Sequence, residues 1–291
     1  MKKKILVTGS KGQLGSEFAL LQSGYQSFEF LFHDADTLDL TDFKKVEQFI
    51  KANTPAYIVN CAAFTAVDKA ETESAAAYLI NAEVPGKLAE LASKNHACFI
   101  HISTDYVFDG KNHKPYVEDD LTNPASEYGK SKLAGEQKVM QYDNSVIIRT
   151  SWLYSQFGHN FIKTILRLAK ERETLSIVFD QTGTPTNAAD LASAICMLIA
   201  YSEKNHFPKG IYHYSNEGVC SWYDFAREIT EQAGLGCKIN PITTDHYPQP
   251  APRPHYSVMN KSKIKQAIDI EIPYWKDSFS TCLKNILKNS R

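Results

Sequence analysis

Short apolar runs alternate with longer amphipathic segments through the first half of the chain. The runs are rich in Ile, Val, Leu and Phe, and their length is typical of buried strands at residues 4–8, 28–33, 56–61, 98–102 and 145–149. Between them, apolar side chains recur at helical spacing in residues 15–21, 42–52, 73–95 and 125–142, the second of these with Thr41 as its N-cap. This alternation predicts a parallel sheet with helices on both faces.

The pattern changes towards the C-terminal end. Helices are expected at residues 160–172, 188–201 and 221–233, and residues 175–179 are expected to return to the sheet. From about residue 206 the apolar runs shorten and prolines cluster between residues 241 and 254. We predict an α/β fold: a Rossmann-type doubly wound parallel sheet with a smaller C-terminal substrate-binding domain. The sheet domain would hold residues 1–152 and about 174–204, and the smaller domain about 153–173 and 205–291.

Composition excludes several classes of protein. The chain has 291 residues and a net charge of -1, so no overall field favours nucleic acid or an anionic membrane. No apolar run approaches the roughly 18 residues of a membrane helix, and nothing resembles a signal peptide. The six cysteines are scattered without a C-x-x-C pair, which favours free thiols in a reducing compartment over a zinc site. We therefore expect a cytoplasmic protein.

A glycine-rich loop follows the first predicted strand. Residues 7–15 read VTGSKGQLG, so Gly9, Gly12 and Gly15 lie between a strand and a helix. Glycines there allow a tight turn and a close backbone approach to a pyrophosphate, and the helix N-terminus offers free N–H groups. The spacing is G-x-x-G-x-x-G and not the commoner G-x-G-x-x-G. The loop still predicts a dinucleotide cofactor, NADPH or NADH, because the strand that such a motif requires precedes it.

The end of the second strand normally distinguishes NAD from NADP. Asp34 would accept the ribose 2′-hydroxyl and favour NAD, whereas Lys11 and His33 would meet a 2′-phosphate and favour NADP. These signals conflict; we expect an NAD(P)H site with NADPH as the preferred cofactor.

Two further segments suit the cofactor. Asp39 and Leu40 place a carboxylate and an apolar side chain where the adenine edge would lie. Ala62 and Ala63 follow the third strand, and their small side chains leave room for the cofactor, although packing alone explains two alanines as well.

The candidate chemistry lies at the fourth strand and the helix after it. Tyr128 and Lys132 are four residues apart, which places them on one helix face. The lysine charge is expected to lower the pKa of Tyr128, making the phenol a general acid near neutral pH. Thr104, at the carboxyl end of the fourth strand, would bind a substrate carbonyl oxygen, while Asp105 would either touch substrate or cap the loop.

Longer blocks carry a resemblance over essentially the whole chain. They are AAFTAVDKAE at 62–71, STDYVFDG at 103–110, YGKSKLAGE at 128–136, RTSW at 149–152, DQTGTPT at 180–186 and the Arg253-Pro254 pair. With the glycine loop, they make the chain similar to the dTDP-4-dehydrorhamnose reductase family, within the extended short-chain dehydrogenase/reductase superfamily. The resemblance implies NAD(P)H-dependent reduction of the C4 ketone of dTDP-4-dehydro-L-rhamnose to dTDP-L-rhamnose, the last step of dTDP-rhamnose biosynthesis.

The resemblance also implies roles for single residues. Tyr128 would be the acid and Lys132 the ribose anchor, while Thr104 and Asp105 would meet the sugar. The remaining positions carried over are Gln13 and Leu14 in the cofactor loop, Ala62, Ala63 and Thr65 beside the cofactor, Trp152 in the sugar pocket, and Arg253 as a clamp on the diphosphate. An arginine in a proline-rich surface loop is the alternative interpretation of Arg253.

Two departures from the family pattern matter. Phe64 stands where the family commonly has histidine. Some members dimerise through Mg²⁺ held by glutamates, and Glu17 matches the first of these, but no glutamate near the C-terminus completes the set. A homodimer is therefore possible and its metal doubtful.

The alternatives in function are a sibling nucleotide-4-keto-sugar reductase with another C4 outcome, or a non-catalytic regulatory subunit of this fold.

Overall fold

The computed structural model describes residues 2–289. Its centre is a six-stranded sheet in the order β2-β1-β3-β4-β5-β10, and each adjacent pair is parallel. The strands are β1 (Lys3–Thr8), β2 (Phe28–His33), β3 (Tyr57–Asn60), β4 (Cys98–Thr104), β5 (Ser145–Thr150) and β10 (Gly210–His213). The doubly wound parallel sheet that the sequence predicted is confirmed.

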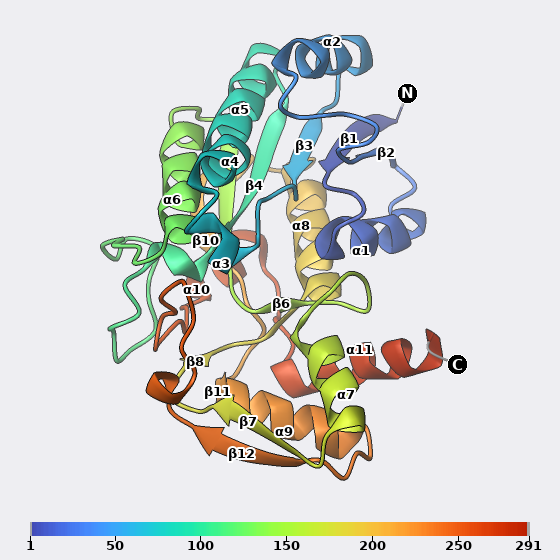
Figure 1. Cartoon of the computed structure of the whole chain (residues 1–291). Coiled ribbons are helices and arrows are strands. Elements are labelled where there is room, and N and C mark those ends of the chain that lie inside the picture. The colour runs from blue at the N-terminus through green and yellow to red at the C-terminus, as the bar shows by residue number, and fades with distance from the viewer. Residues whose placement is uncertain (1, 290–291) are drawn as a thin grey trace.

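Helices cover both faces of this sheet (Figure 1). One face carries α1 (Gln13–Leu21), α8 (Ala188–Ser202) and α10 (Ser262–Ile268). The other carries α2 (Phe43–Asn53), α5 (Val84–Lys94) and α6 (Glu127–Val139). Successive strand residues point to opposite faces, so Val59 joins the first core and Ile58 the second. Two apolar layers therefore need continuously apolar strands, which is the pattern the sequence has.

The predicted helix over residues 73–95 is interrupted. It comprises α4 (Ser74–Tyr78), a π-helical turn η2 (Leu79–Glu83), and α5. Pro85 lacks the N–H that a regular helix would direct to the carbonyl of Asn81, so the hydrogen-bond ladder changes register there. The cap expected at Thr41 is also wrong, because Asp42 accepts the N–H of Lys45 at the start of α2.

A smaller unit lies at one end of the sheet (Figure 1). It packs α7 (Phe161–Glu171), α9 (Trp222–Gln232) and α11 (Trp275–Asn289) with the parallel pair β7 (Thr174–Val178) and β12 (Lys238–Ile242). The expected return of residues 175–179 to the central sheet is wrong. The place beside β5 is taken by β10, and Leu175 packs with Ile239 in the smaller core. We predicted β7 for the sheet domain and β10 for the smaller domain, and the structure places each in the other unit. The other boundaries of the predicted division remain a prediction.

Short elements complete the structure. They are β6 (Leu153–Tyr154) paired with β9 (Thr186–Asn187), β8 (Thr182–Gly183) paired with β11 (Cys220–Ser221), α3 (Val67–Ala70), and the 3₁₀ turns η1 (Gln22–Gly24), η3 (Asp105–Val107) and η4 (Thr244–His246). All six cysteines are free thiols, and four of them are buried. Within residues 2–289, none of the helices has the length and apolar character to cross a membrane.

Strand order defines where a ligand would bind. The chain passes from β1 to β2 on one side and then crosses to β3 on the other, so β1 marks a switch point. Open α/β sheets bind ligands at such a point, outside the carboxyl ends of the strands. The smaller unit lies beyond those ends (Figure 1), so the predicted cofactor loop and the predicted catalytic side chains come together between the two units.

Candidate active site

The start of α6 places the tyrosine. Ser126 caps the helix by accepting the N–H of Gly129 at 3.2 Å. A Cβ at Gly129 would lie 2.3 Å from the carbonyl oxygen of Tyr106, so only glycine allows α6 to pack this closely on η3. Tyr128 consequently lies beside Thr104 at the end of β4, close enough for the Thr104 hydroxyl to influence the pKa of the phenol.

Tyr128 is half-buried, and loss of hydration raises its pKa to about 12, although the nearby Thr104 hydroxyl acts in the opposite direction. Our expectation that Lys132 lowers this pKa is wrong, because loss of hydration outweighs the other influences on the phenol. The ring of Tyr106 packs edge-on at 5.4 Å. At neutral pH Tyr128 is therefore a protonated phenol, which is the state that a general acid needs.

Lys132 lies one helical turn along α6 and is 2% exposed. Its Nζ donates to the carbonyl oxygen of Ile102 at 2.6 Å. Burial lowers the pKa of Lys132 to about 8, while the charge of Glu136 acts to raise it. A lysine with this pKa gains or loses its proton close to physiological pH.

Asp105 completes the end of β4 and is 2% exposed. Thr104 Oγ1 lies 3.0 Å from Asp105 Oδ1, to which it donates. Burial raises the pKa of Asp105 to about 7. Both roles left open for Asp105 stay predictions; Thr104 Oγ1 accepts the N–H of Tyr106 at 3.2 Å, and backbone N–H groups of the same turn also act on the Asp105 carboxylate.

The glycine loop has the geometry of a phosphate cradle. Gly9 has φ +65, and a Cβ there would lie 2.7 Å from the backbone N of Ala62. A Cβ at Gly15 would lie 2.4 Å from the carbonyl oxygen of Gly9. Gly12 is the N-cap of α1 and supplies no side-chain cap, so the first N–H groups of the helix are open to an anion. These residues fit the pyrophosphate of a dinucleotide.

The next two loop residues serve different purposes. Leu14 is buried in the core, so only its backbone is available to a ligand. Gln13 reaches the smaller unit: its Nε2 donates to the carbonyl oxygen of Leu153 at 3.4 Å, and its Oε1 accepts from Asn160 Nδ2 at 3.0 Å. The cofactor loop is therefore tied directly to the segment that leads into α7.

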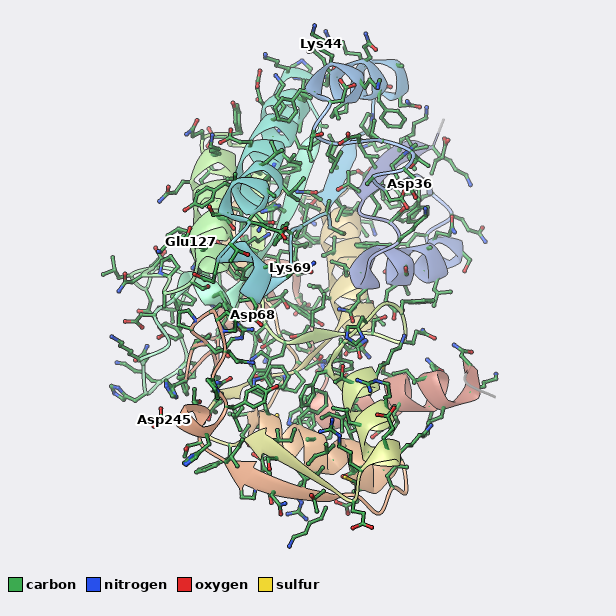
Figure 2. The ribbon with its side chains drawn as sticks, viewed as in Figure 1. Asp36, Lys44, Asp68, Lys69, Glu127 and Asp245 are labelled. Carbon is green, nitrogen blue, oxygen red and sulfur yellow. The ribbon has the colours of Figure 1, made fainter. Side chains whose placement is uncertain are left out.

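The residues with conflicting cofactor signals contact one another. Lys11 Nζ pairs with Asp34 Oδ2 at 2.9 Å and with Asp36 Oδ2 at 2.6 Å; Figure 2 labels Asp36 beside β2. The hydrogen bond from Lys11 lowers the pKa of Asp34, and burial lowers that of His33, so the imidazole is neutral at physiological pH. The Asp34 carboxylate, which would bind a 2′-hydroxyl, and the Lys11 ammonium, which would bind a 2′-phosphate, are thus in direct contact. The preference between NADH and NADPH stays a prediction.

The remaining predicted cofactor residues follow β2 and β3. Asp39 accepts the N–H and the hydroxyl of Thr41, and Leu40 packs against the core. Ala62 and Ala63 are half-buried and Thr65 is exposed. Their contacts with a cofactor remain predictions.

Trp152 follows β5, and Arg253 lies in the proline-rich segment near the C-terminal end. Trp152 has φ +49 and stacks on Trp222 with ring centroids 3.6 Å apart. Arg253 is 14% exposed in its side chain and pairs with Asp68 Oδ2 at 2.9 Å. Figure 2 labels Asp68 on α3, at the end of the sheet that is nearer to the smaller unit. Such a half-enclosed guanidinium is not a free surface arginine.

Glu17 does not fit a metal site between subunits. Its side chain is buried, accepts from the Ser155 hydroxyl at 2.6 Å, and has a pKa raised by burial. In the part of the chain that the structure describes, no group of three or more His, Cys, Asp or Glu side chains is arranged to hold a metal ion.

Three buried polar residues at the site were missed by the sequence analysis. Asn60 and His101 lie inside β3 and β4 and connect to Lys132. Asn81, in the π turn, bonds both the N–H and the carbonyl of Phe64 through its side chain. For Asn60 and His101 the available signal was a polar side chain within an apolar strand, which marks a buried group in need of partners.

The sheet and the trio of Thr104, Tyr128 and Lys132 define the class of this protein: it is an NAD(P)H-dependent oxidoreductase on a Rossmann-type fold. Residues 2–288 match the family model described as the RmlD substrate binding domain. The chain belongs to this family.

Close relatives are similar along their whole length. The chain is 42% identical to the spore coat polysaccharide biosynthesis protein SpsK of Bacillus subtilis over 97% of each chain. It is 40% identical to a dTDP-4-dehydrorhamnose reductase of Clostridium acetobutylicum, with a TM-score of 0.92 over 98% of this chain and 99% of that one. It is 37% identical to the Bacillus anthracis dTDP-4-dehydrorhamnose reductase solved with NADP, with a TM-score of 0.91 over 99% and 100%.

Proposed function

We propose that the protein reduces the C4 ketone of dTDP-4-dehydro-L-rhamnose to give dTDP-L-rhamnose. The observation that carries the proposal is the meeting of Thr104, Tyr128 and Lys132 at the end of β4, in a chain that matches dTDP-4-dehydrorhamnose reductases over almost its whole length. The nicotinamide cofactor supplies the hydride when bound.

The side chains supply orientation and the proton. Tyr128 gives its phenolic proton to the C4 oxygen as that oxygen gains charge. The Thr104 hydroxyl lies beside the phenol; with substrate present it turns its single proton from Asp105 to the same oxygen and fixes the position of that oxygen. Lys132 carries its charge next to the phenol and holds the ribose of the cofactor, as its burial close to Tyr128 on one helix face permits.

Substrate recognition would involve the smaller unit. Asp105 meets the sugar hydroxyls, Trp152 lines the sugar pocket, and Arg253 exchanges Asp68 for the diphosphate, because a guanidinium suits phosphate oxygens. NADPH is the expected cofactor, with NADH as the alternative. Location in the cytoplasm and a possible homodimer remain predictions.

The test is an assay with dTDP-4-dehydro-L-rhamnose made in situ by the upstream enzymes. Loss of absorbance at 340 nm is followed separately with NADPH and NADH, using Lys132→Ala as the inactive control. Oxidation by the wild type alone supports the proposal, and the faster cofactor is the preferred one. If the protein binds NADPH or NADH but oxidises neither of them, the result would contradict the proposal and favour the regulatory-subunit interpretation.

A further inference from the structure

A buried chain of polar side chains runs across three neighbouring strands to Lys132. Thr8 Oγ1 donates to Asn60 Oδ1 at 2.7 Å, and Asn60 Nδ2 lies 3.1 Å from His101 Nδ1. His101 Nε2 in turn lies 3.5 Å from Lys132 Nζ. Asn60 and His101 are 0% exposed. Apolar side chains would fill these strand positions at lower cost, since a buried polar group must find a partner to avoid a penalty.

The direction of each hydrogen bond follows from a backbone donor. The N–H of Ala62 can only donate, and it reaches Asn60 Oδ1 at 3.3 Å. This oxygen is therefore the acceptor, and the amide nitrogen of Asn60 is the donor towards His101. Since Nδ1 of His101 accepts, a neutral imidazole carries its proton on Nε2.

That proton points at Lys132. Burial, together with the charge of Lys132, lowers the pKa of His101 well below its usual value, so the imidazole is neutral. An N–H directed at Nζ favours an amine, which accepts a hydrogen bond, over an ammonium, which only donates. His101 thus acts against the protonated form of Lys132.

The other groups around Lys132 act in the opposite sense. The carbonyl oxygen of Ile102 accepts from Nζ, and the carboxylate of Glu136 favours a charged lysine. Glu136 is itself bonded by Arg149 of β5 at 2.7 Å and by the hydroxyl of Ser103 at 2.5 Å. Its charge is thereby partly committed to other donors, and the lysine lies between opposing influences.

We propose that His101, oriented by Asn60, is a positioning residue that holds Lys132 at the balance between ammonium and amine. The consequence is that the pH range over which Lys132 carries its proton is fixed by the tautomer of a buried histidine. This inference rests on the role given to Lys132 in the proposed reduction.

The tautomer is tested on the protein alone. Long-range ¹H–¹⁵N correlation spectra of ¹⁵N-histidine-labelled protein report which ring nitrogen carries the proton, and His101→Gln identifies the His101 signals. The expected result is a neutral ring protonated on Nε2 from pH 6 to 9. A ring protonated on Nδ1, or an imidazolium in that range, would overturn the proposal.

A variant that reverses the direction of the hydrogen bond between residue 60 and His101 tests the effect of the His101 tautomer on the protonation of Lys132. In Asn60→Asp the side chain can only accept, so His101 must carry its proton on Nδ1 and present Nε2 as an acceptor to Lys132. The basic limb of the kcat/KM profile should then move up by about one pH unit, a tenfold change in proton affinity. Thr8→Val is the matched control, because the N–H of Ala62 still orients Asn60; its limb should not move.

Other outcomes are equally decisive. A limb that stays in place in Asn60→Asp, or one that moves while His101 keeps its proton on Nε2, would contradict the inference. Because the spectra need no sugar, the two proposals fail separately. An Nε2-protonated ring without sugar reduction would overturn the proposed function alone, and an Nδ1-protonated ring with normal reduction would overturn the positioning role alone.

Discussion

At the residue scale, the reduction depends on one half-buried phenol, that of Tyr128. Tyr128 stays protonated because burial raises its pKa. Replacement by phenylalanine keeps the ring and removes the proton, so turnover of Tyr128→Phe should fall by roughly 100-fold or more while the Kd of the cofactor changes little. Steady-state kinetics and fluorescence titration with NADPH measure the two quantities.

The neighbouring tyrosine offers a matched control. Tyr106 packs edge-on against Tyr128 and is also half-buried, so Tyr106→Phe removes a hydroxyl from the same aromatic pair without removing the proton donor. Turnover of this variant should stay within a few-fold of the wild type. Near-normal turnover in Tyr128→Phe would exclude Tyr128 from the mechanism.

Asp105 should leave a mark on the pH dependence of stability. Burial raises its pKa from the ordinary value of 3.8 to about 7, so the folded chain binds this proton more tightly than the unfolded chain. Its contribution to stability is full below about pH 4 and is lost as the pH rises towards 7. Thermal unfolding of Asp105→Asn should therefore show a gain in Tm over the wild type that is larger at pH 7.5 than at pH 5. An equal difference at both pH values would mean that Asp105 ionises normally.

Single residues were predictable from the sequence where spacing alone decides. The Tyr128–Lys132 spacing and the place of Thr104 at a strand end are local features, and the structure brings Tyr128 to Thr104 as expected. The pairing of Lys11 with Asp34 and the link from His101 to Lys132 depend on which strands are neighbours. For the same reason the pKa of Tyr128 could not be read from its spacing to Lys132.

At the element scale, α6 is positioned by a glycine. A Cβ at Gly135 would lie 2.0 Å from the carbonyl oxygen of Asn81, the same carbonyl that Pro85 leaves without its usual donor. Because the obstacle is backbone, Gly135→Ala should destabilise the protein by about 1–3 kcal/mol, measured by urea unfolding. Gly236→Ala, where nothing lies within 4 Å, is the control and should be nearly neutral.

The displacement of α6 has a second expected effect. Tyr128 and Lys132 would move with the helix, so kcat of Gly135→Ala should fall even at temperatures where the variant is folded. Unchanged stability and unchanged kcat together would show that α6 is not held by this contact.

Elements differ in how far the sequence predicts them. The central strands carry apolar residues on both faces. Such a pattern is typical of a sheet that is covered by helices on both sides, so it could be predicted from the sequence. Residues 174–178 have the same short apolar pattern, and nothing local states whether β5 or β12 is the partner. The π turn results from Pro85 within an otherwise helical pattern, so the break is local but its geometry depends on packing with α6.

At the scale of the whole molecule, the site is closed by contacts between the two units. Gln13 bonds Asn160 across the junction, and Ser155 bonds Glu17. Arg253 bonds Asp68 in the same way, bringing the proline-rich C-terminal loop onto α3. These contacts fix the position of the cofactor loop relative to the smaller unit.

Arg253→Ala tests the substrate side of this junction. Loss of the guanidinium should raise the KM for the nucleotide sugar by roughly tenfold or more, with a smaller change in kcat, because charge-assisted bonds to phosphate are strong. Arg253→Lys retains the charge but not the paired donors, so its KM should lie between those of the wild type and Arg253→Ala. A KM unchanged in both variants would assign Arg253 to the loop structure alone.

The most direct test of the central claim follows the hydride into the product. The protein is incubated with dTDP-4-dehydro-L-rhamnose and NADPH that carries deuterium at both C4 positions of the nicotinamide, and the sugar is analysed by NMR. The account predicts dTDP-L-rhamnose with deuterium at C4 of the sugar. Transfer that yields the other C4 epimer would keep the chemistry of Tyr128 and move the protein to a sibling activity, whereas an absence of deuterium transfer would contradict the reductase assignment itself.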